Sequence, residues 1–112
     1  MQFLDQSFLL TQFGDKATAQ TVLQVYLEEE SGLSQPLMVA LAEKPELAEV
    51  DESAHKIKGS LDLIGVKSLA RLSAEICEAC RADKEPEAWE KLSELCRSLP
   101  ILRSEVETYL KP

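Results

Sequence analysis

The sequence predicts an all-α protein, an up-and-down antiparallel four-helix bundle with a short N-terminal helix that caps one end. Only four glycines and five prolines occur among 112 residues, and a chain rich in Leu, Ala, Glu and Lys favours helices. Apolar residues recur at spacings of three and four, the period of a buried helix face. The segments between them are short, which makes neighbouring helices antiparallel. The length suits one domain over residues 1–112 with one modest core.

Glycine separates the first two elements. A short apolar piece over residues 3–13 ends at Gly14, and Asp15 then suits the N-cap of a long helix. Gly32 and Pro36 interrupt that helix, and we expect a kink there or, as the alternative, a break into two helices. Its apolar stripe consists of Ala19, Val22, Leu23, Tyr26, Leu33, Leu37, Ala40 and Leu41.

The remaining three helices are bounded by proline, glycine and polar residues. The third is expected to begin near Pro45 and to run to Ile64, with Gly65 as a left-handed C-terminal cap. The fourth covers residues 66–81. After a polar break over residues 83–86, the last covers residues 87–109 and bends at Pro100. The inward positions of these two helices are Leu69, Leu72, Ile76 and Cys80, followed by Trp89, Leu92, Leu95, Cys96, Leu99, Leu102 and Val106.

The charge balance limits the possible partners. A net charge of −8 argues against binding to nucleic acid, which needs clustered Lys and Arg, and against docking on an anionic membrane surface. The chain shows no basic leader followed by an apolar run, and no apolar stretch approaches the roughly 20 residues that cross a bilayer. These features favour a cytoplasmic chain whose partners are proteins, and we also expect the chain to be a monomer.

The cysteines raise a redox or zinc hypothesis. Cys77 and Cys80 have the C-x-x-C spacing, and with Cys96 they make three thiols that cannot all pair within one chain. A structural zinc needs four ligands, for which only His55 could add a nitrogen. A thioredoxin-like motif expects a βαβ context. We interpret the cysteines as small buried hydrophobes on helix faces and expect no metal site and no cofactor on this chain.

The only histidine, His55, lies in the stretch SAHKIKGSLDLIGV over residues 53–66. On a wheel at about 100° per residue, the apolar positions of this helix cluster within roughly 60° of one direction, the core. With Val50 as zero, His55 falls at about 140°, Asp62 at about 120°, Gly59 at about 180° and Lys58 at about 80°. We therefore expect His55 on the solvent side. The core positions are Leu47, Val50, Ala54, Ile57, Leu61 and Ile64.

These residue types point to phosphoryl chemistry. Gly59 in an exposed helix interior costs about 0.5–1 kcal/mol relative to Ala, so its place one turn after His55 suggests that another surface approaches the helix there. An exposed imidazole, with an unperturbed pKa of about 6.5, is a good nucleophile at neutral pH. Lys58 is within reach of an anion on His55, and phosphoryl is the obvious candidate. No glycine-rich phosphate loop exists, so another protein must bring the group.

Residues 54–76, AHKIKGSLDLIGVKSLARLSAEI, resemble the histidine-containing phosphotransfer (HPt) domain of bacterial multistep phosphorelays. The family pattern is H-x-x-K-G-[SA]-x-x-x-x-G, followed by leucines at helical spacing. It is matched by His55, Lys58, Gly59, Ser60 and Gly65, with Leu69 and Leu72 behind. The stretch FGDKATAQTVLQVYLEEE also looks like the opening of the family's second helix, so the likeness covers nearly the whole chain.

The resemblance implies a phosphocarrier, not a kinase with its own ATP site. His55 would accept phosphoryl from the aspartate of one receiver domain and pass it to another, with Lys58 steadying the group and Gly59 leaving room for the receiver. The implied partners are response-regulator receivers and a hybrid sensor histidine kinase, and Mg²⁺ is expected on the receiver.

Around the histidine we expect Gly59, Asp62, Lys56 and Asp51 to contact the docked partner. Two positions depart from the small residues that the family often has. Leu61 belongs to the core and is harmless, whereas Asp62 puts a negative charge near the phosphoryl site and bears on partner preference.

Two alternative functions stay open. A dimerisation domain of a sensor histidine kinase is also helical with a phosphorylated histidine, but such domains typically place an acidic residue directly after it, where this chain has Lys56. A helical adaptor that binds partners without phosphorylation is the second alternative, and the presence of both His55 and Lys58 speaks against it.

Overall fold

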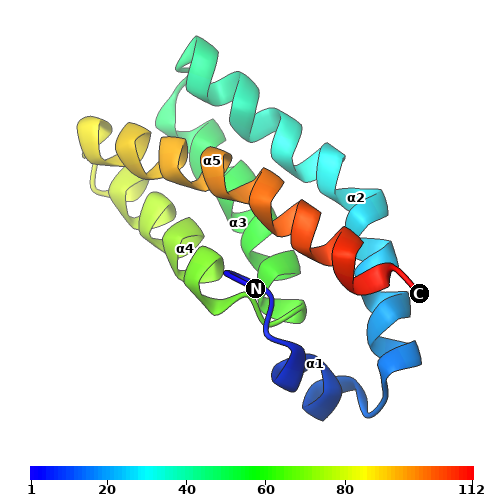
Figure 1. Ribbon diagram of the computed structural model, residues 1–112. Helices are drawn as coiled ribbons and strands as arrows, with labels where there is room; N and C mark the ends of the chain where they lie inside the picture. The colour runs from blue at the N-terminus through cyan, green and yellow to red at the C-terminus, as the bar shows by residue number, and fades with distance from the viewer.

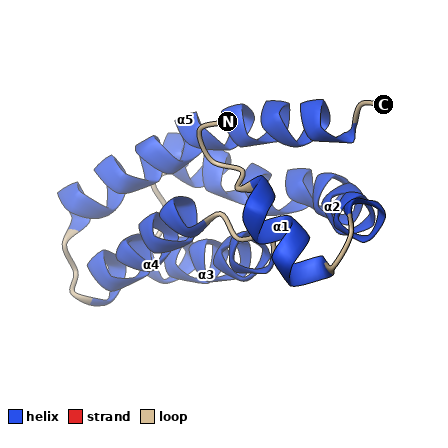
Figure 2. Ribbon diagram, turned by 60° about the horizontal axis from the view of Figure 1, so that its bottom comes forward, coloured by secondary structure: helices blue, strands red, loops and turns tan.

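The computed structural model describes residues 1–112 and contains five helices and no strand (Figures 1 and 2). The helices are α1 (Gln6–Phe13), α2 (Lys16–Glu43), α3 (Leu47–Leu63), α4 (Lys67–Arg81) and α5 (Glu85–Leu110). In the bundle α2 packs on α3 and α5, and α4 also packs on α3 and α5 (Figure 1). Figure 2 shows α1 across one end. The predicted all-α bundle with an N-terminal capping helix is confirmed, and none of its helices has the length and apolar character of a membrane span.

The predicted caps of the first elements are present. The Asp15 carboxylate accepts a hydrogen bond from the backbone N–H of Thr18 at 2.7 Å and so caps α2. Gly14 ends α1 with φ +87°, and its N–H donates to the carbonyl of Leu10 at 2.9 Å. Gly65 adopts φ +75° in the turn between α3 and α4, the left-handed conformation that glycine tolerates without strain.

Pro36 and Pro100 both lie inside continuous helices. The alternative of two helices separated at Gly32 and Pro36 is wrong, because α2 is continuous from Lys16 to Glu43. Pro100 likewise lies within α5 without ending it. Both prolines are exposed, so the carbonyls that they leave unpaired can face water.

Two helices start at other residues than the sequence predicts. Pro45 precedes α3, which begins at Leu47 with Glu46 as its N-cap. The break expected over residues 83–86 is shorter, because α5 already begins at Glu85 and Pro86 occupies its first turn. Proline is tolerated there because first-turn N–H groups have no partner within the helix.

One apolar cluster of 27 buried residues fills the centre of the bundle. Helix α3 contributes Val50, Ala54, Ile57 and Leu61, each with no exposed surface. Trp89 and Cys96, predicted inward, are only half-buried at the edge of this cluster. Burial of the apolar α3 face fixes the rotation of that helix, since turning it would bring these side chains into water. The opposite face is thereby held toward solvent.

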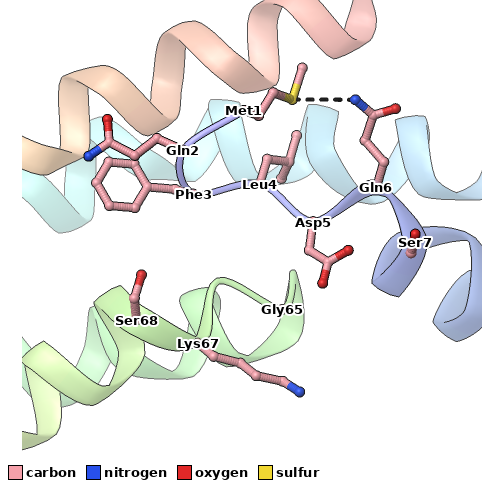
Figure 3. Close-up of a pocket in the computed structure, with 10 residues that line it drawn as sticks. All are labelled: Met1, Gln2, Phe3, Leu4, Asp5, Gln6, Ser7, Gly65, Lys67 and Ser68. Carbon is pink, nitrogen blue, oxygen red and sulfur yellow. Dashed lines mark hydrogen bonds between the residues drawn. The ribbon is translucent and has the colours of Figure 1, made fainter.

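The chain begins with an extended segment over residues 1–5 that is tied to α5. The backbone N–H groups of Gln2, Phe3 and Leu4 donate to the Glu105 carboxylate at 2.8–2.9 Å. Burial raises the pKa of the Glu105 carboxyl, but these hydrogen bonds outweigh it and hold the pKa below its usual value. Figure 3 shows the segment between α5 and the start of α4, beside a pocket of about 530 Å³. The segment over residues 1–5, held to Glu105 by these hydrogen bonds, closes the end of the bundle near Gly65.

Gly65→Ala is expected to destabilise the bundle. The left-handed φ disfavours any side chain, and a Cβ at this buried position would overlap the ring of Phe8. We expect a loss of about 1–3 kcal/mol in the free energy of unfolding, measured by urea denaturation. Gly32→Ala is the matched control, because Gly32 is helical and its Cβ would have open space. It should stabilise by about 0.5–1 kcal/mol. Equal effects of the two substitutions on the free energy of unfolding would contradict the requirement for glycine at position 65.

Candidate functional site

The solvent-facing side of α3 carries the only imidazole of the chain. His55, Gly59 and Asp62 are exposed and Lys58 is half-buried, as the helical periodicity predicts. The His55 side chain takes part in none of the hydrogen bonds or ion pairs found around it. Its ring nitrogens are therefore free to meet a group brought from outside.

Gly59 leaves open space one helical turn after His55. A Cβ built on Gly59 would meet no other atom within 4 Å. No neighbouring helix therefore packs on this glycine, and close helix packing does not explain its presence. The gap exposes the backbone of α3 beside the imidazole, where an incoming surface can approach closely.

The two lysines that flank His55 are each paired with a carboxylate on the same helix. Lys58 Nζ lies 2.8 Å from Asp62 Oδ2, and Lys56 Nζ lies 3.3 Å from Glu52 Oε1. Both pairs join residues four apart, and their side chains keep substantial exposure, so each contributes little to stability. Lys58 and Asp62, predicted as separate site residues, are thus brought into direct contact.

Asp51 lies one turn before His55 and joins α3 to α4. Its half-buried carboxylate accepts hydrogen bonds from Nε and Nη2 of Arg81 at 3.2 and 3.4 Å. Its backbone carbonyl accepts the Sγ–H of Cys77 at 3.5 Å. Sequence reasoning missed Arg81, since the contact joins residues 30 positions apart.

The cysteines do not form a reactive site. Cys77 and Cys80 are free and buried on α4. Burial, and then the hydrogen bond to Asp51, raises the pKa of Cys77 to about 12, and burial also raises that of Cys80. Thiolate is the form that attacks disulfides, so the raised pKa values keep both thiols protonated and poorly nucleophilic near neutral pH. They serve as small core residues, in keeping with the interpretation above.

A shallow apolar hollow of about 200 Å³ lies between α2 and α3, next to the Gly59 turn. Its rim includes Val25 and Leu63, whose exposed fractions of 45% and 58% are high for such side chains. The hollow is lined by Thr21, Val22, Val25, Tyr26, Glu29, Ser60, Leu63 and Ile64. The helical wheel places Leu63 about 140° from the core, so an exposed leucine was visible from periodicity. The same arithmetic places Val25 about 100° from the centre of the buried stripe of α2, so its exposure was also visible from periodicity.

These observations define a class of protein, an all-helical bundle that presents one unpaired imidazole on a convex, open helix face. Such a surface encloses no small substrate and instead suits contact with another macromolecule.

Comparison with known proteins identifies the family. A family model described as the Hpt domain matches residues 21–109, which include all of α3 and α4. The chain therefore belongs to the Hpt family, and the resemblance drawn from the sequence is confirmed. Hpt domains are the histidine phosphotransfer modules of phosphorelays; they interact with receiver domains and histidine kinases and are themselves phosphocarriers. No curated protein and no solved structure gives a significant match to the chain.

Proposed function

We propose that residues 1–112 act as one phosphocarrier unit in which His55 accepts a phosphoryl group from the aspartate of one receiver domain and passes it to another. The single observation that carries this proposal is the exposed, unpaired imidazole of His55 beside the open space at Gly59. Membership of the Hpt family supplies the reaction class. We expect the unit to act as a monomer in the cytoplasm.

The chemistry is a displacement at phosphorus. A ring nitrogen of His55 attacks the phosphorus of the aspartyl phosphate, and the N–P bond forms as the P–O bond breaks. The electron pair of that bond leaves with the aspartate carboxylate, and the proton of the other ring nitrogen passes to water. Onward transfer reverses these events on a second receiver. Mg²⁺ held by the receiver would offset the charge of the moving group.

Docking is expected to centre on the exposed face of α3. The gap at Gly59 would admit the receiver backbone. Asp62 lies on the same face of α3 and would contact the receiver beside this gap. Lys56 on the α2 side and Asp51 on the α4 side would contact its edges. The apolar hollow with Val25 and Leu63 at its rim offers additional contact area next to the phosphoryl site.

Transfer from a phosphorylated receiver tests the proposal. The purified chain is mixed with a phosphorylated receiver domain and Mg²⁺, and its intact mass is followed with time. We expect the mass of one phosphoryl group to appear and then to disappear when a second, unphosphorylated receiver is added. A panel of receivers that yields stable complexes and no mass change would favour the adaptor alternative and contradict the proposal.

Lys58→Ala is expected to slow the acceptance of phosphoryl from a receiver about fivefold or more while leaving the fold almost unchanged. A charge-assisted contact between Lys58 and the phosphoryl group should contribute about 1–3 kcal/mol in a shielded interface. The exposed pair with Asp62 contributes only about 0.3–0.5 kcal/mol to stability. Stopped-flow transfer rates and melting temperature are the measurements. Lys91→Ala is the control, since Lys91 is paired with Glu75 on another side of the bundle. Identical rates for both variants would contradict the role of Lys58.

A further inference from the structure

The ion pair between Lys58 and Asp62 suggests a role for Asp62 that goes beyond docking. Resting on the proposed function of His55, we propose that Asp62 is a positioning residue. It holds the Lys58 ammonium in the unphosphorylated protein and competes with the phosphoryl group for it. In this way Asp62 weakens the stabilisation of the phosphoryl group by Lys58 and favours onward transfer of that group.

The direction of the Lys58 side chain is the first observation. Its ammonium lies 2.8 Å from the carboxylate of Asp62, four residues toward the C-terminal end of α3, whereas His55 lies three residues toward the N-terminal end. Side chains of an α-helix lean toward the N-terminus of the helix, so a lysine is well placed to reach a group on the residue three positions before it. Asp62 therefore holds Lys58 in the direction opposite to the phosphoryl site.

The order and the exposure of the two residues in this pair are the second observation, and both indicate a weak pair. Acidic residues placed four positions before basic ones pair better than the reverse order. Glu52 and Lys56 have the favourable order, whereas Lys58 and Asp62 have the unfavourable one. The side chains of Lys58 and Asp62 are also 37% and 53% exposed, so water and salt screen their attraction. A phosphoryl group on His55 carries more charge than one carboxylate and should draw Lys58 away.

Competition makes Asp62 act through Lys58. Each phosphorylation of His55 would break the Lys58–Asp62 pair and leave the Asp62 carboxylate without a partner, because no other basic group is paired with it. Each departure of the phosphoryl group would restore the pair. Part of the attraction between Lys58 and phosphoryl is thus offset, and the phosphohistidine becomes a better donor.

The test compares Asp62→Asn with Glu52→Gln. Both substitutions remove one negative charge from an ion pair on the exposed side of α3, but only the first frees Lys58. The chain is phosphorylated with phosphoramidate, whose N–P bond breaks as the bond to His55 forms and ammonia leaves. A receiver donor provides a second loading route. After the donor is removed, loss of phosphoryl from the isolated chain is followed by intact mass, in the wild-type and the Lys58→Ala backgrounds.

We expect Asp62→Asn to lengthen the phosphohistidine lifetime about two- to tenfold and Glu52→Gln to leave it unchanged. The effect of Asp62→Asn should largely vanish in the Lys58→Ala background. In NMR spectra, the ε-methylene signals of Lys58 should shift on phosphorylation more than those of Lys56. Equal lifetimes for the two single variants would overturn the proposal, as would an undiminished effect without Lys58. Labelling by phosphoramidate but not by any receiver would overturn only the proposed function.

Discussion

Replacing His55 by Gln is expected to abolish phosphorylation of the chain by a receiver domain. His55 is the only histidine, and no other side chain on the exposed face of α3 offers a neutral nitrogen nucleophile at neutral pH. The adduct on the wild-type chain should be lost in acid and kept in base, because a phosphoramidate is hydrolysed through its protonated nitrogen. Incubation with a labelled receiver, followed by acid or base treatment, measures both properties.

The loss of labelling must not reflect loss of the fold. His55 is exposed and unpaired, so His55→Gln should change the free energy of unfolding by no more than about 0.5 kcal/mol. Circular dichroism and thermal melting check this. Phosphoryl that persists on the folded His55→Gln variant would show that the acceptor is another residue.

Substitutions at Gly59 are expected to separate function from stability. Gly59→Ala should raise stability by about 0.5–1 kcal/mol, because alanine loses less backbone entropy in a helix and the added Cβ meets open space. Gly59→Glu should almost eliminate transfer while helicity is retained. Its side chain would fill the approach to His55, and its charge would repel the phosphoryl group.

Gly32 supplies the matched control for these variants. It is an exposed helical glycine with open space around its Cβ, and it lies on α2. Gly32→Glu adds the same bulk and charge on a different helix, so we expect it to reduce transfer far less than Gly59→Glu does. A melting temperature that falls for Gly59→Ala would contradict the open surface at this position. Equal transfer by the two glutamate variants would contradict the docking role.

The exposed face of α3 could be predicted from sequence because a single physical constraint determines it. Val50, Ala54, Ile57 and Leu61 recur at helical spacing, and their burial fixes which side of the helix faces water. Gly65 could be placed as a turn for a similarly local reason, since it follows the last apolar position of that helix.

Features that depend on contacts between distant residues could not be predicted. The Arg81–Asp51 pair needs the register of α4 against α3, and the tether of the N-terminal segment joins Leu4 to Glu105, 101 positions away. Spacing allowed contact between Lys58 and Asp62 but also between Lys58 and a group on His55. Only the side-chain positions show which contact the unphosphorylated chain makes.

Locating the phosphoryl group on the wild-type chain tests the role of His55 as phosphoryl acceptor. After loading from a phosphorylated receiver with Mg²⁺, the chain is digested at alkaline pH. Its peptides are then fragmented by electron transfer, which preserves the N–P bond. We predict one phosphoryl group per chain, on the imidazole of His55. A phosphoryl group on Ser60, on a carboxylate or on any other side chain, or no phosphoryl group under conditions in which the receiver donates to another Hpt domain, would contradict it.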